Sequence, residues 1–180
     1  MNNSYDIGLV IRAVEFAAQK HRMQRRKDRD ASPYINHPIA LMHVLWIVGG
    51  ISDPLILAAA ALHDTIEDTE TTEEELRTTF GEEITQIVVE MTDDKSLPKE
   101  DRKRLQIEHA YGMSREGALV KLADKICNLR DVAANPPLGW SLKRRVEYFD
   151  WAKAVVDGLP RVSKNLLVKF EAAYGTRPPA

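Results

Sequence analysis

The chain has 180 residues, of which 44% are hydrophobic and 29% charged, the ordinary balance of a folded protein of about one domain. Its formal charge of −2 gives no overall positive field, so we expect no nucleic-acid partner, and a phosphorylated ligand would need a local basic cluster. The single cysteine, Cys127, excludes an intrachain disulfide and a cysteine-rich zinc site.

The first residues do not show the basic and then apolar pattern of a secretion signal. The longest apolar run, 55–62, is far shorter than the roughly 20 residues that cross a bilayer. We therefore expect a reduced, cytoplasmic protein without membrane association.

The N-terminal part predicts two helices separated by a polar loop. Apolar residues recur at i, i+4, i+7 and i+11 from Ile7, which predicts a first helix that ends near residue 21. The strongly polar stretch 22–32 indicates a loop, and this loop carries the basic run 25–27. A second helix is predicted over 38–48, where Gly49 and the glycine after it end the pattern.

The middle of the chain predicts three helices of different character. The segment 55–67 is rich in alanine and leucine, so we expect one buried helix with close neighbours. Thr72 and Glu75 fit a capping box that begins a short helix, with Gly81 as its stop. Apolar residues at i, i+3, i+4 and i+7 from Ile84 predict a further amphipathic helix.

The remaining segments continue the helical pattern. The charged segment 98–111 predicts a solvated helix, and an apolar stripe over 119–133 predicts a long one. Ser141 can cap the next helix, whose core face is predicted to include Leu142, and a last helix is expected at about 162–174.

No alternating strand pattern and no internal repeat interrupts these helices. The prediction is an all-α fold, a compact helical bundle that forms one domain over residues 1–180. Its core is expected over about 7–158, with a C-terminal helix at about 161–174.

Four side chains with acid, base or ligand chemistry stand at the end of the predicted helix 55–67: His63, Asp64, Glu67 and Asp68. They form two pairs spaced i, i+4, which would stack on one side of a helix. Burying carboxylates beside an alanine-rich face is costly unless a cation or hydrogen bonds compensate, and a bound metal would do so. The alternative is a solvated helix end with His63 in the core, and this motif alone leaves both open.

Two other segments offer compatible ligands. His37 stands before Pro38, which restricts its backbone and would help to hold a ligand, although an ordinary turn residue is the simpler interpretation of His37 alone. Asp124, Asn128 and Asp131 share one helical face, which by itself is most simply a solvated face.

Several motifs then occur in a fixed order, at residues 20–22, 24–28, 33–38, 62–69, 92–95, 119–131 and 147–149. Together they resemble the RelA/SpoT-type HD-domain hydrolases, and most closely their small stand-alone members, the metazoan SpoT homologues. The resemblance spans about residues 13–156, nearly the whole chain, and implies an HD-domain helical bundle.

The resemblance also implies a metal site in which His37, His63, Asp64 and Asp124 bind one divalent ion, usually Mn²⁺. Mixed imidazole and carboxylate ligands suit such a borderline cation, but they do not select manganese over zinc or iron. The choice of manganese therefore depends on the resemblance.

The implied catalytic residues are Glu67 and Asp68, which would orient or deprotonate a metal-activated water. Two neighbouring carboxylates raise the pKa of one of them, which suits a base that works near neutral pH. The implied reaction cleaves guanosine tetra- or pentaphosphate, (p)ppGpp, at its 3′ oxygen into GDP or GTP and pyrophosphate. We expect hydrolysis alone, because the synthetase domain of the long relatives has no counterpart in these 180 residues.

The resemblance implies six substrate-binding residues: Arg26, Lys27, Asn128, Lys95, Arg144 and Tyr148. Arg26 and Lys27 would flank the guanine and its 5′ phosphates, since arginine can grip phosphate with two parallel hydrogen bonds. Asn128 would contact the sugar. The alternatives are a solvated basic loop at 25–27 and a core aromatic at Tyr148.

The remaining histidines, His21, His43 and His109, are expected to be structural or surface residues. The tryptophans, Trp46, Trp140 and Trp151, are expected to be packing residues. Two other functions stay open. One is an HD phosphatase that acts on another nucleotide such as NADPH or a deoxynucleotide. The other is a nucleotide-binding module without catalysis, which the acidic pair Glu67 and Asp68 disfavours because a sensor would not need it.

Overall fold

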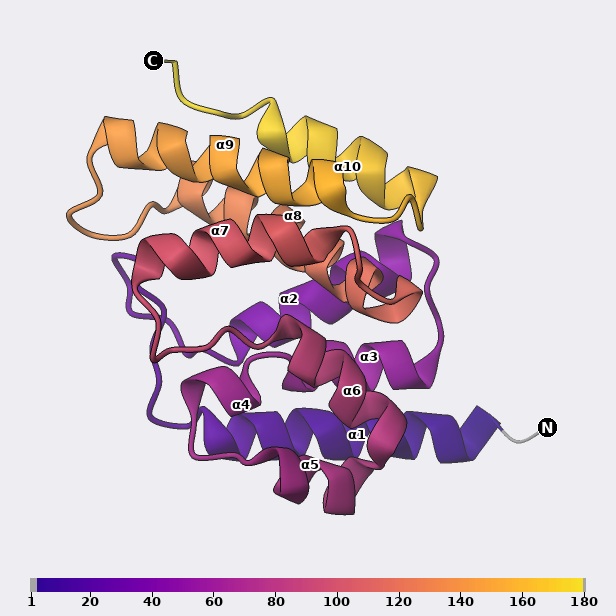
Figure 1. Cartoon of the computed structure of the whole chain (residues 1–180). Helices are drawn as coiled ribbons and strands as arrows, with labels where there is room; N and C mark the ends of the chain where they lie inside the picture. The colour runs from indigo at the N-terminus through magenta and orange to yellow at the C-terminus, as the bar shows by residue number, and fades with distance from the viewer. Residues whose placement is uncertain (1–2, 180) are drawn as a thin grey trace.

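The structure is a computed structural model that describes the backbone of residues 3–179 and the side chains from Ile7 onward (Figure 1). Over these residues the only β-type pairing is an isolated antiparallel bridge between Arg25 and Pro33. The predicted all-α fold is confirmed.

The elements follow one another as α1 Asn3–Lys20, α2 Asn36–His43, the π-helix η1 Val44–Val48, α3 Pro54–Leu62, α4 Thr65–Asp68, α5 Glu73–Phe80, α6 Glu82–Met91, α7 Lys99–Ala110, α8 Arg115–Ala134, α9 Leu142–Gly158 and α10 Lys164–Tyr174. None of the helices in the described part of the chain combines the length and the apolar character that crossing a membrane requires.

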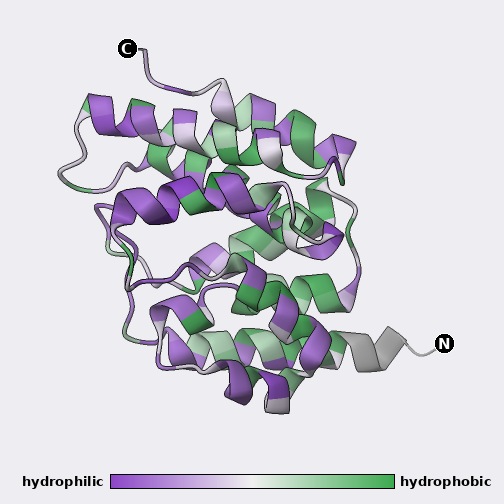
Figure 2. Cartoon of the chain, viewed as in Figure 1, coloured by the Kyte–Doolittle hydropathy of each residue, from purple (hydrophilic) through white to green (hydrophobic). Residues whose placement is uncertain are grey.

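The helices lie in layers around α3 and α8. In Figure 1, α1 and α5 lie at one end of the molecule and α9 and α10 at the other. Helix α3 packs against α1, α2, α6 and α8, and α8 packs against α9 and α10. The hydropathy of the helices in Figure 2 matches this packing: α3 is mostly hydrophobic, whereas α7 is mostly hydrophilic. The two central helices thus hold the parts of the bundle in fixed positions.

The apolar stripe over 119–133 occupies the centre of this packing, as predicted. Leu119, Leu122, Ile126 and Leu129 of α8 are at most 1% exposed. Each such side chain contributes about 1.5–3 kcal/mol through its removal from water. Helix α8 is therefore the rigid element from which residues of the candidate site project.

Side-chain caps begin several helices where the sequence predicted them. The Thr72 hydroxyl accepts a hydrogen bond from the Glu75 N–H over 3.1 Å, and the Ser141 hydroxyl accepts one from the Arg144 N–H over 3.2 Å. Gly81 follows α5 with a φ of 88°, a conformation that favours glycine. These local signals were sufficient to place the beginnings of α5 and α9 and the end of α5.

The prediction of one helix over 55–67 is wrong, because α3 ends at Leu62. Asp64 has φ −104° and ψ 3°, outside the helical range, and α4 is a separate turn. The last carbonyls of α3 accept side-chain hydrogen bonds, from His63 Nδ1 to Ala60 over 2.9 Å and from Thr65 Oγ1 to Leu62 over 2.7 Å. The break separates His63 and Asp64 from the acidic pair, so the four residues do not share one continuous helix.

Two predictions of burial, for Leu142 and Trp46, are wrong. The apolar spacing from Ile7 correctly predicted α1, but Ile7 and Ile11 are 59% and 61% exposed, and α1 instead presents the buried Ala13 and Ala17 to the alanine-rich α3. Small side chains allow the two helices to approach closely, which a search for the most apolar stripe does not detect. Leu142 and Trp46 are 45% and 51% exposed, although we expected both to pack in the core.

The second helix begins earlier than predicted, at Asn36 instead of residue 38. Pro38 lies in its first turn, where a proline loses no needed N–H group. The last turn, Val44–Val48, has π-helical hydrogen bonding, and Gly49 follows it. As a result His37 lies at the start of a helix and is buried, not in an exposed turn.

Candidate active site

A cavity of about 870 Å³ lies beside the C-terminal half of α8, a volume typical of sites that bind small molecules. Residues of α2, α4, α8 and α9 line it, together with the loop between α1 and α2. Five of the six predicted substrate-binding residues line this cavity: Arg26, Lys27, Lys95, Asn128 and Tyr148. The predicted residues His37, Glu67 and Asp68 line it as well.

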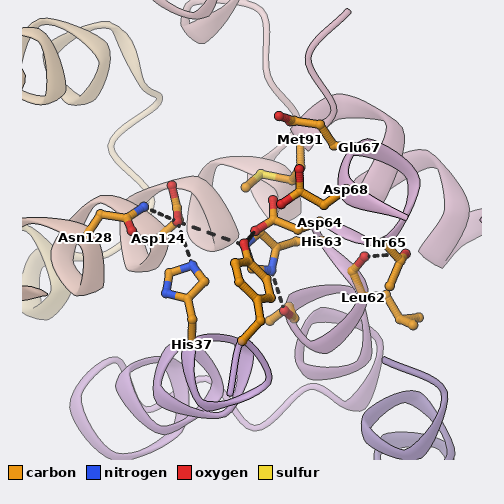
Figure 3. A network of polar contacts seen from close by, with 12 residues as sticks. His37, Leu62, His63, Asp64, Thr65, Glu67, Asp68, Met91, Asp124 and Asn128 are labelled. Atoms are coloured by element: carbon orange, nitrogen blue, oxygen red, sulfur yellow. Dashed lines mark hydrogen bonds and ion pairs between the residues drawn. The ribbon is translucent and has the colours of Figure 1, made fainter. Parts of the chain in front are cut away.

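Three buried side chains meet beside this cavity: His37 from α2, His63 from the end of α3 and Asp124 from α8 (Figure 3). Each offers one ligand atom, and these atoms lie within 4.8 Å of one another. His37 Nε2 is 3.2 Å from Asp124 Oδ1, and His63 Nε2 is 4.0 Å from the same oxygen. The fold thus brings together residues that are 87 positions apart, and the group suits a divalent metal ion.

His63 is oriented as a metal ligand requires. Its Nδ1 donates to the Ala60 carbonyl over 2.9 Å, so Nε2 is the nitrogen that faces the other candidate ligands. Nε2 lies 2.9 Å from Asp64 Oδ2 and 4.0 Å from Asp124 Oδ1. Burial lowers the pKa of His63, but these two carboxylates outweigh it and raise the pKa to about 9, so the metal-free ring keeps a proton on Nε2. A cation would take the place of that proton between the imidazole and the carboxylates.

Asp64, the fourth predicted ligand, lies at the edge of this group. The Tyr34 hydroxyl donates a hydrogen bond to Asp64 Oδ2. Burial and the nearby Asp64 carboxylate raise the pKa of the Tyr34 phenol far above its ordinary value. Tyr34 therefore stays protonated as a donor that holds one oxygen of Asp64, leaving the other free of this contact.

Asp124 is held as an anion by its neighbours. Burial alone would raise the pKa of this carboxyl, but the Lys125 ammonium and His37 hold it well below its ordinary range. Lys125 Nζ is 3.2 Å from Oδ2, and Asn128 Nδ2 donates to Oδ1 over 2.6 Å. The interpretation as a solvated face is therefore wrong for Asp124. Asp131, which lies two helical turns later on the same face, is exposed.

The segment after α6 holds the acidic pair on α4. The backbone N–H of Asp93 donates to Glu67 Oε2 over 3.1 Å, and the Lys95 ammonium pairs with Asp68. Burial raises the pKa of Glu67 to about 7, the Asp93 N–H opposes this rise, and the Asp64 carboxylate adds to it. The two carboxylates thus differ: Glu67 is close to its titration point at neutral pH, and Asp68 is paired with a cation.

Replacing Glu67 with glutamine should stabilise the metal-free protein at neutral and alkaline pH, because the amide avoids the cost of burying a carboxylate. The folded state keeps this proton up to about pH 7, whereas a free glutamate loses it near 4.5. Wild-type stability therefore falls as pH rises through this window, and the variant does not follow. After allowance for solvent screening we expect a gain of roughly 1–2 kcal/mol above pH 7.

Urea unfolding of the chelated proteins on both sides of this window measures the gain. Glu74→Gln is the control, because Glu74 is an exposed side chain of α5. A Glu67→Gln variant no more stable than wild type above pH 7 would contradict the burial cost.

Comparison with known proteins then identifies the fold family. Residues 13–147 match the family profile described as the HD domain, which is most of the chain. The chain belongs to the HD-domain family. It is 54% identical over 171 residues to the guanosine-3′,5′-bis(diphosphate) 3′-pyrophosphohydrolase MESH1 of Xenopus tropicalis, covering 95% of this chain and 96% of that protein. The MESH1 of Homo sapiens is 52% identical over 157 residues, 87% of this chain and 88% of that one.

A solved structure agrees with this HD-domain assignment. It is that of a metazoan orthologue of SpoT that hydrolyses ppGpp, and its superposition on this chain has a TM-score of 0.91. The two are 46% identical, and the match covers 94% of this chain and 95% of that one. The predicted resemblance to the metazoan SpoT homologues is confirmed.

The two arginines among the predicted substrate-binding residues of this HD domain differ in their position relative to the cavity. Arg26 pairs with Asp131 and its guanidinium carbon lies 5.7 Å from the centre of the Tyr34 ring. Arg144 is the one predicted substrate residue that does not line the cavity. Its guanidinium lies over the Trp140 ring at 4.4 Å, and Trp140 does line the cavity. Arg144 therefore contacts a residue of the cavity wall, Trp140, but does not line the cavity itself.

Sequence reasoning assigned no role to several residues that complete the site. Tyr34 and Gln24 contact Asp64 and Asp68, and the backbone of Asp93 contacts Glu67. Trp140, expected only to pack, forms part of the cavity wall next to Tyr148, with ring centres 5.4 Å apart. Gln24, Tyr34 and Asp93 each belong to a motif that the sequence displayed, but their partners lie on other elements, so no spacing rule points to them.

Proposed function

We propose that this HD-domain protein is a metal-dependent 3′-pyrophosphohydrolase of guanosine 3′,5′-bis(diphosphate) and of the corresponding pentaphosphate. One observation carries the proposal: a buried His37, His63 and Asp124 group lies beside the acidic pair, at a cavity whose wall includes Arg26, Lys27 and Lys95. The names of the relatives at 54% and 52% identity support this activity.

His37, His63 and Asp124 are proposed to hold one divalent ion, with Asp64 as a fourth ligand. We propose Mn²⁺ as that ion, because two imidazoles with carboxylates suit a borderline cation and the family resemblance favours manganese. When bound, such an ion polarises a phosphate oxygen and lowers the pKa of water. Tyr34, Asn128 and the Ala60 carbonyl keep the ligands oriented for it.

Glu67 is proposed to take the proton from the attacking water. A pKa of about 7 allows this carboxylate to be a base at neutral pH and to return the proton later. Asp68 is proposed to orient the same water, with the Lys95 ammonium balancing its charge. Water attacks the phosphorus on the 3′ oxygen, the bond between that phosphorus and the 3′ oxygen breaks, and the nucleoside oxygen takes up a proton as pyrophosphate leaves.

The cations of the cavity are proposed to bind the phosphates. Arg26 and Lys27 would contact the 5′ phosphates and the guanine, and a phosphate at Arg26 would compete with Asp131 for the guanidinium. Asn128 and Tyr148 are proposed to contact the nucleoside, and Arg144 to act from behind Trp140. We further propose a cytoplasmic location, which the buried, unpaired Cys127 supports.

Product analysis of the purified protein with guanosine tetraphosphate tests the proposal. We expect stoichiometric GDP and pyrophosphate with Mn²⁺, and neither after chelation. Release of orthophosphate instead would indicate a phosphatase, and faster turnover of NADPH in a parallel assay would indicate another nucleotide as substrate. Binding without any product would indicate a module without catalysis.

A further inference from the structure

Gln24 and the buried His21 form a chain of hydrogen bonds that ends on Asp68. Gln24 Nε2 donates to Asp68 Oδ2 over 2.8 Å, and His21 Nδ1 is 2.6 Å from Gln24 Oε1. We infer that Gln24 is a positioning residue that holds the Asp68 carboxylate, and that His21 fixes the orientation of the Gln24 amide. The inference rests on the proposed function, in which Asp68 orients the attacking water.

The direction of each hydrogen bond follows from chemistry. An ionised carboxylate only accepts, so the amide nitrogen of Gln24 must face Asp68 and its carbonyl oxygen must face His21. His21 therefore donates from Nδ1. Its Nε2 is buried without a hydrogen-bond partner among the described residues, and burial lowers the pKa of His21, so the ring is the neutral Nδ1–H tautomer. A flipped amide would lose both contacts.

The backbone of Gln24 is fixed as firmly as its side chain. Its N–H donates to the His21 carbonyl over 2.9 Å, and its carbonyl accepts from the Tyr34 N–H over 3.2 Å. The His21 ring lies against the Tyr34 ring, with centres 4.7 Å apart. The backbone N–H and carbonyl of Gln24 and both ends of its side-chain amide thus have partners. The amide therefore extends to Asp68 from a fixed backbone.

Lys95 is the other donor to Asp68, and it is less constrained. Its side chain is 49% exposed, and it lines the cavity in which the phosphates are proposed to bind. A bound phosphate competes for this ammonium. Gln24 carries no charge and does not respond in the same way, so it keeps Asp68 in place when substrate is present.

The test begins with Gln24→Ala and Gln24→Glu in the full chain with Mn²⁺ and guanosine tetraphosphate. We expect kcat to fall about 10- to 100-fold in Gln24→Ala, with KM and Mn²⁺ affinity close to wild type. Gln24→Glu keeps the shape but faces Asp68 with a second carboxylate, so it should lose at least as much. Gln86→Ala is the matched control, because Gln86 donates to Glu82 on the exposed surface of α6.

Two substitutions of His21 test its part in the chain. His21→Asn places an amide N–H near the position of Nδ1 and should retain kcat, whereas His21→Leu fills the space without a donor and should lower it. The double variant Gln24→Ala with His21→Leu should be no slower than Gln24→Ala alone, since both act through one contact. Melting temperatures report any loss of structure separately.

The outcomes separate this inference from the proposed function. Wild-type protein that releases no pyrophosphate would overturn the function. An active wild type with unchanged kcat in Gln24→Ala or Gln24→Glu would overturn the positioning role. A rise in KM instead of a fall in kcat would do the same, as it would make Gln24 a substrate contact. Equal losses in His21→Asn and His21→Leu, with equal melting temperatures, would remove His21 from the chain.

Discussion

The double substitution Glu67→Gln with Asp68→Asn should abolish pyrophosphate release and leave guanosine tetraphosphate bound. The amides keep the size of both side chains, so the cavity wall retains its shape. They cannot accept a proton from water, however, and the raised pKa that suits Glu67 to this task is lost. General-base catalysis typically contributes 10²- to 10⁴-fold, so we expect a loss of at least about 100-fold in kcat.

Product release and equilibrium binding of the nucleotide, measured on the same preparation with Mn²⁺, check this result. Glu74→Gln with Asp157→Asn makes the same chemical change at two exposed residues and should be silent. Turnover that survives in the Glu67 and Asp68 variant would refute their assigned role. Loss of binding together with turnover would show that the pair shapes the site instead of carrying out the chemistry.

Much of the fold was predictable because it depends on local patterns. The stripe on α8 repeats at helical spacing, and the caps at Thr72 and Ser141 have their partners three residues away. The first helix shows the limit of such patterns. Its most apolar side chains, Ile7 and Ile11, are exposed, because Ala13 and Ala17 allow a closer approach to α3. Periodicity finds the helix but not the face that packs.

The break after Leu62 was not predictable from spacing, since it depends on competition between hydrogen bonds. The side chains of His63 and Thr65 satisfy the carbonyls of Ala60 and Leu62 that the next helical turn would otherwise use. A run rich in alanine and leucine gives no sign of this competition. The same hydrogen bond fixes the ring of His63, so the irregularity and the candidate metal site have one cause.

The residue types of His37 and Asp124 offered possible ligands, but each segment alone indicated a turn residue or a solvated face, and only the family resemblance joined them in one predicted site. Supporting contacts were not predictable, because they depend on tertiary neighbours. Gln24 is an uncharged residue in a basic loop, and only the fold shows that it lies against Asp68. Arg144 shows the converse: the family resemblance predicted that it binds substrate, whereas in the fold its guanidinium lies on Trp140, and Trp140 lines the cavity.

Removing a proposed metal ligand from α8 or α2 should abolish both Mn²⁺ binding and turnover. In Asp124→Asn the side chain loses the charge that attracts a cation, and His37 and Lys125 lose their anionic partner. Breaking such a buried pair costs about 3–5 kcal/mol, so this variant will be less stable. His37→Gln removes a ligand from a different element and leaves the Asp124–Lys125 pair intact, which guards against a loss caused by unfolding alone.

Thermal unfolding with and without Mn²⁺ distinguishes these effects, because an ion that binds only the folded state stabilises it by about 2.7 kcal/mol at 100 times its Kd. Wild type and the surface control Asp157→Asn should show this shift, and Asp124→Asn and His37→Gln should not. The shift does not depend on substrate, so it tests the ligands even if the nucleotide is misassigned. An undiminished Mn²⁺ shift in both ligand variants would place the ion elsewhere, and Glu67 would then lack the neighbouring cation that its role as a base requires.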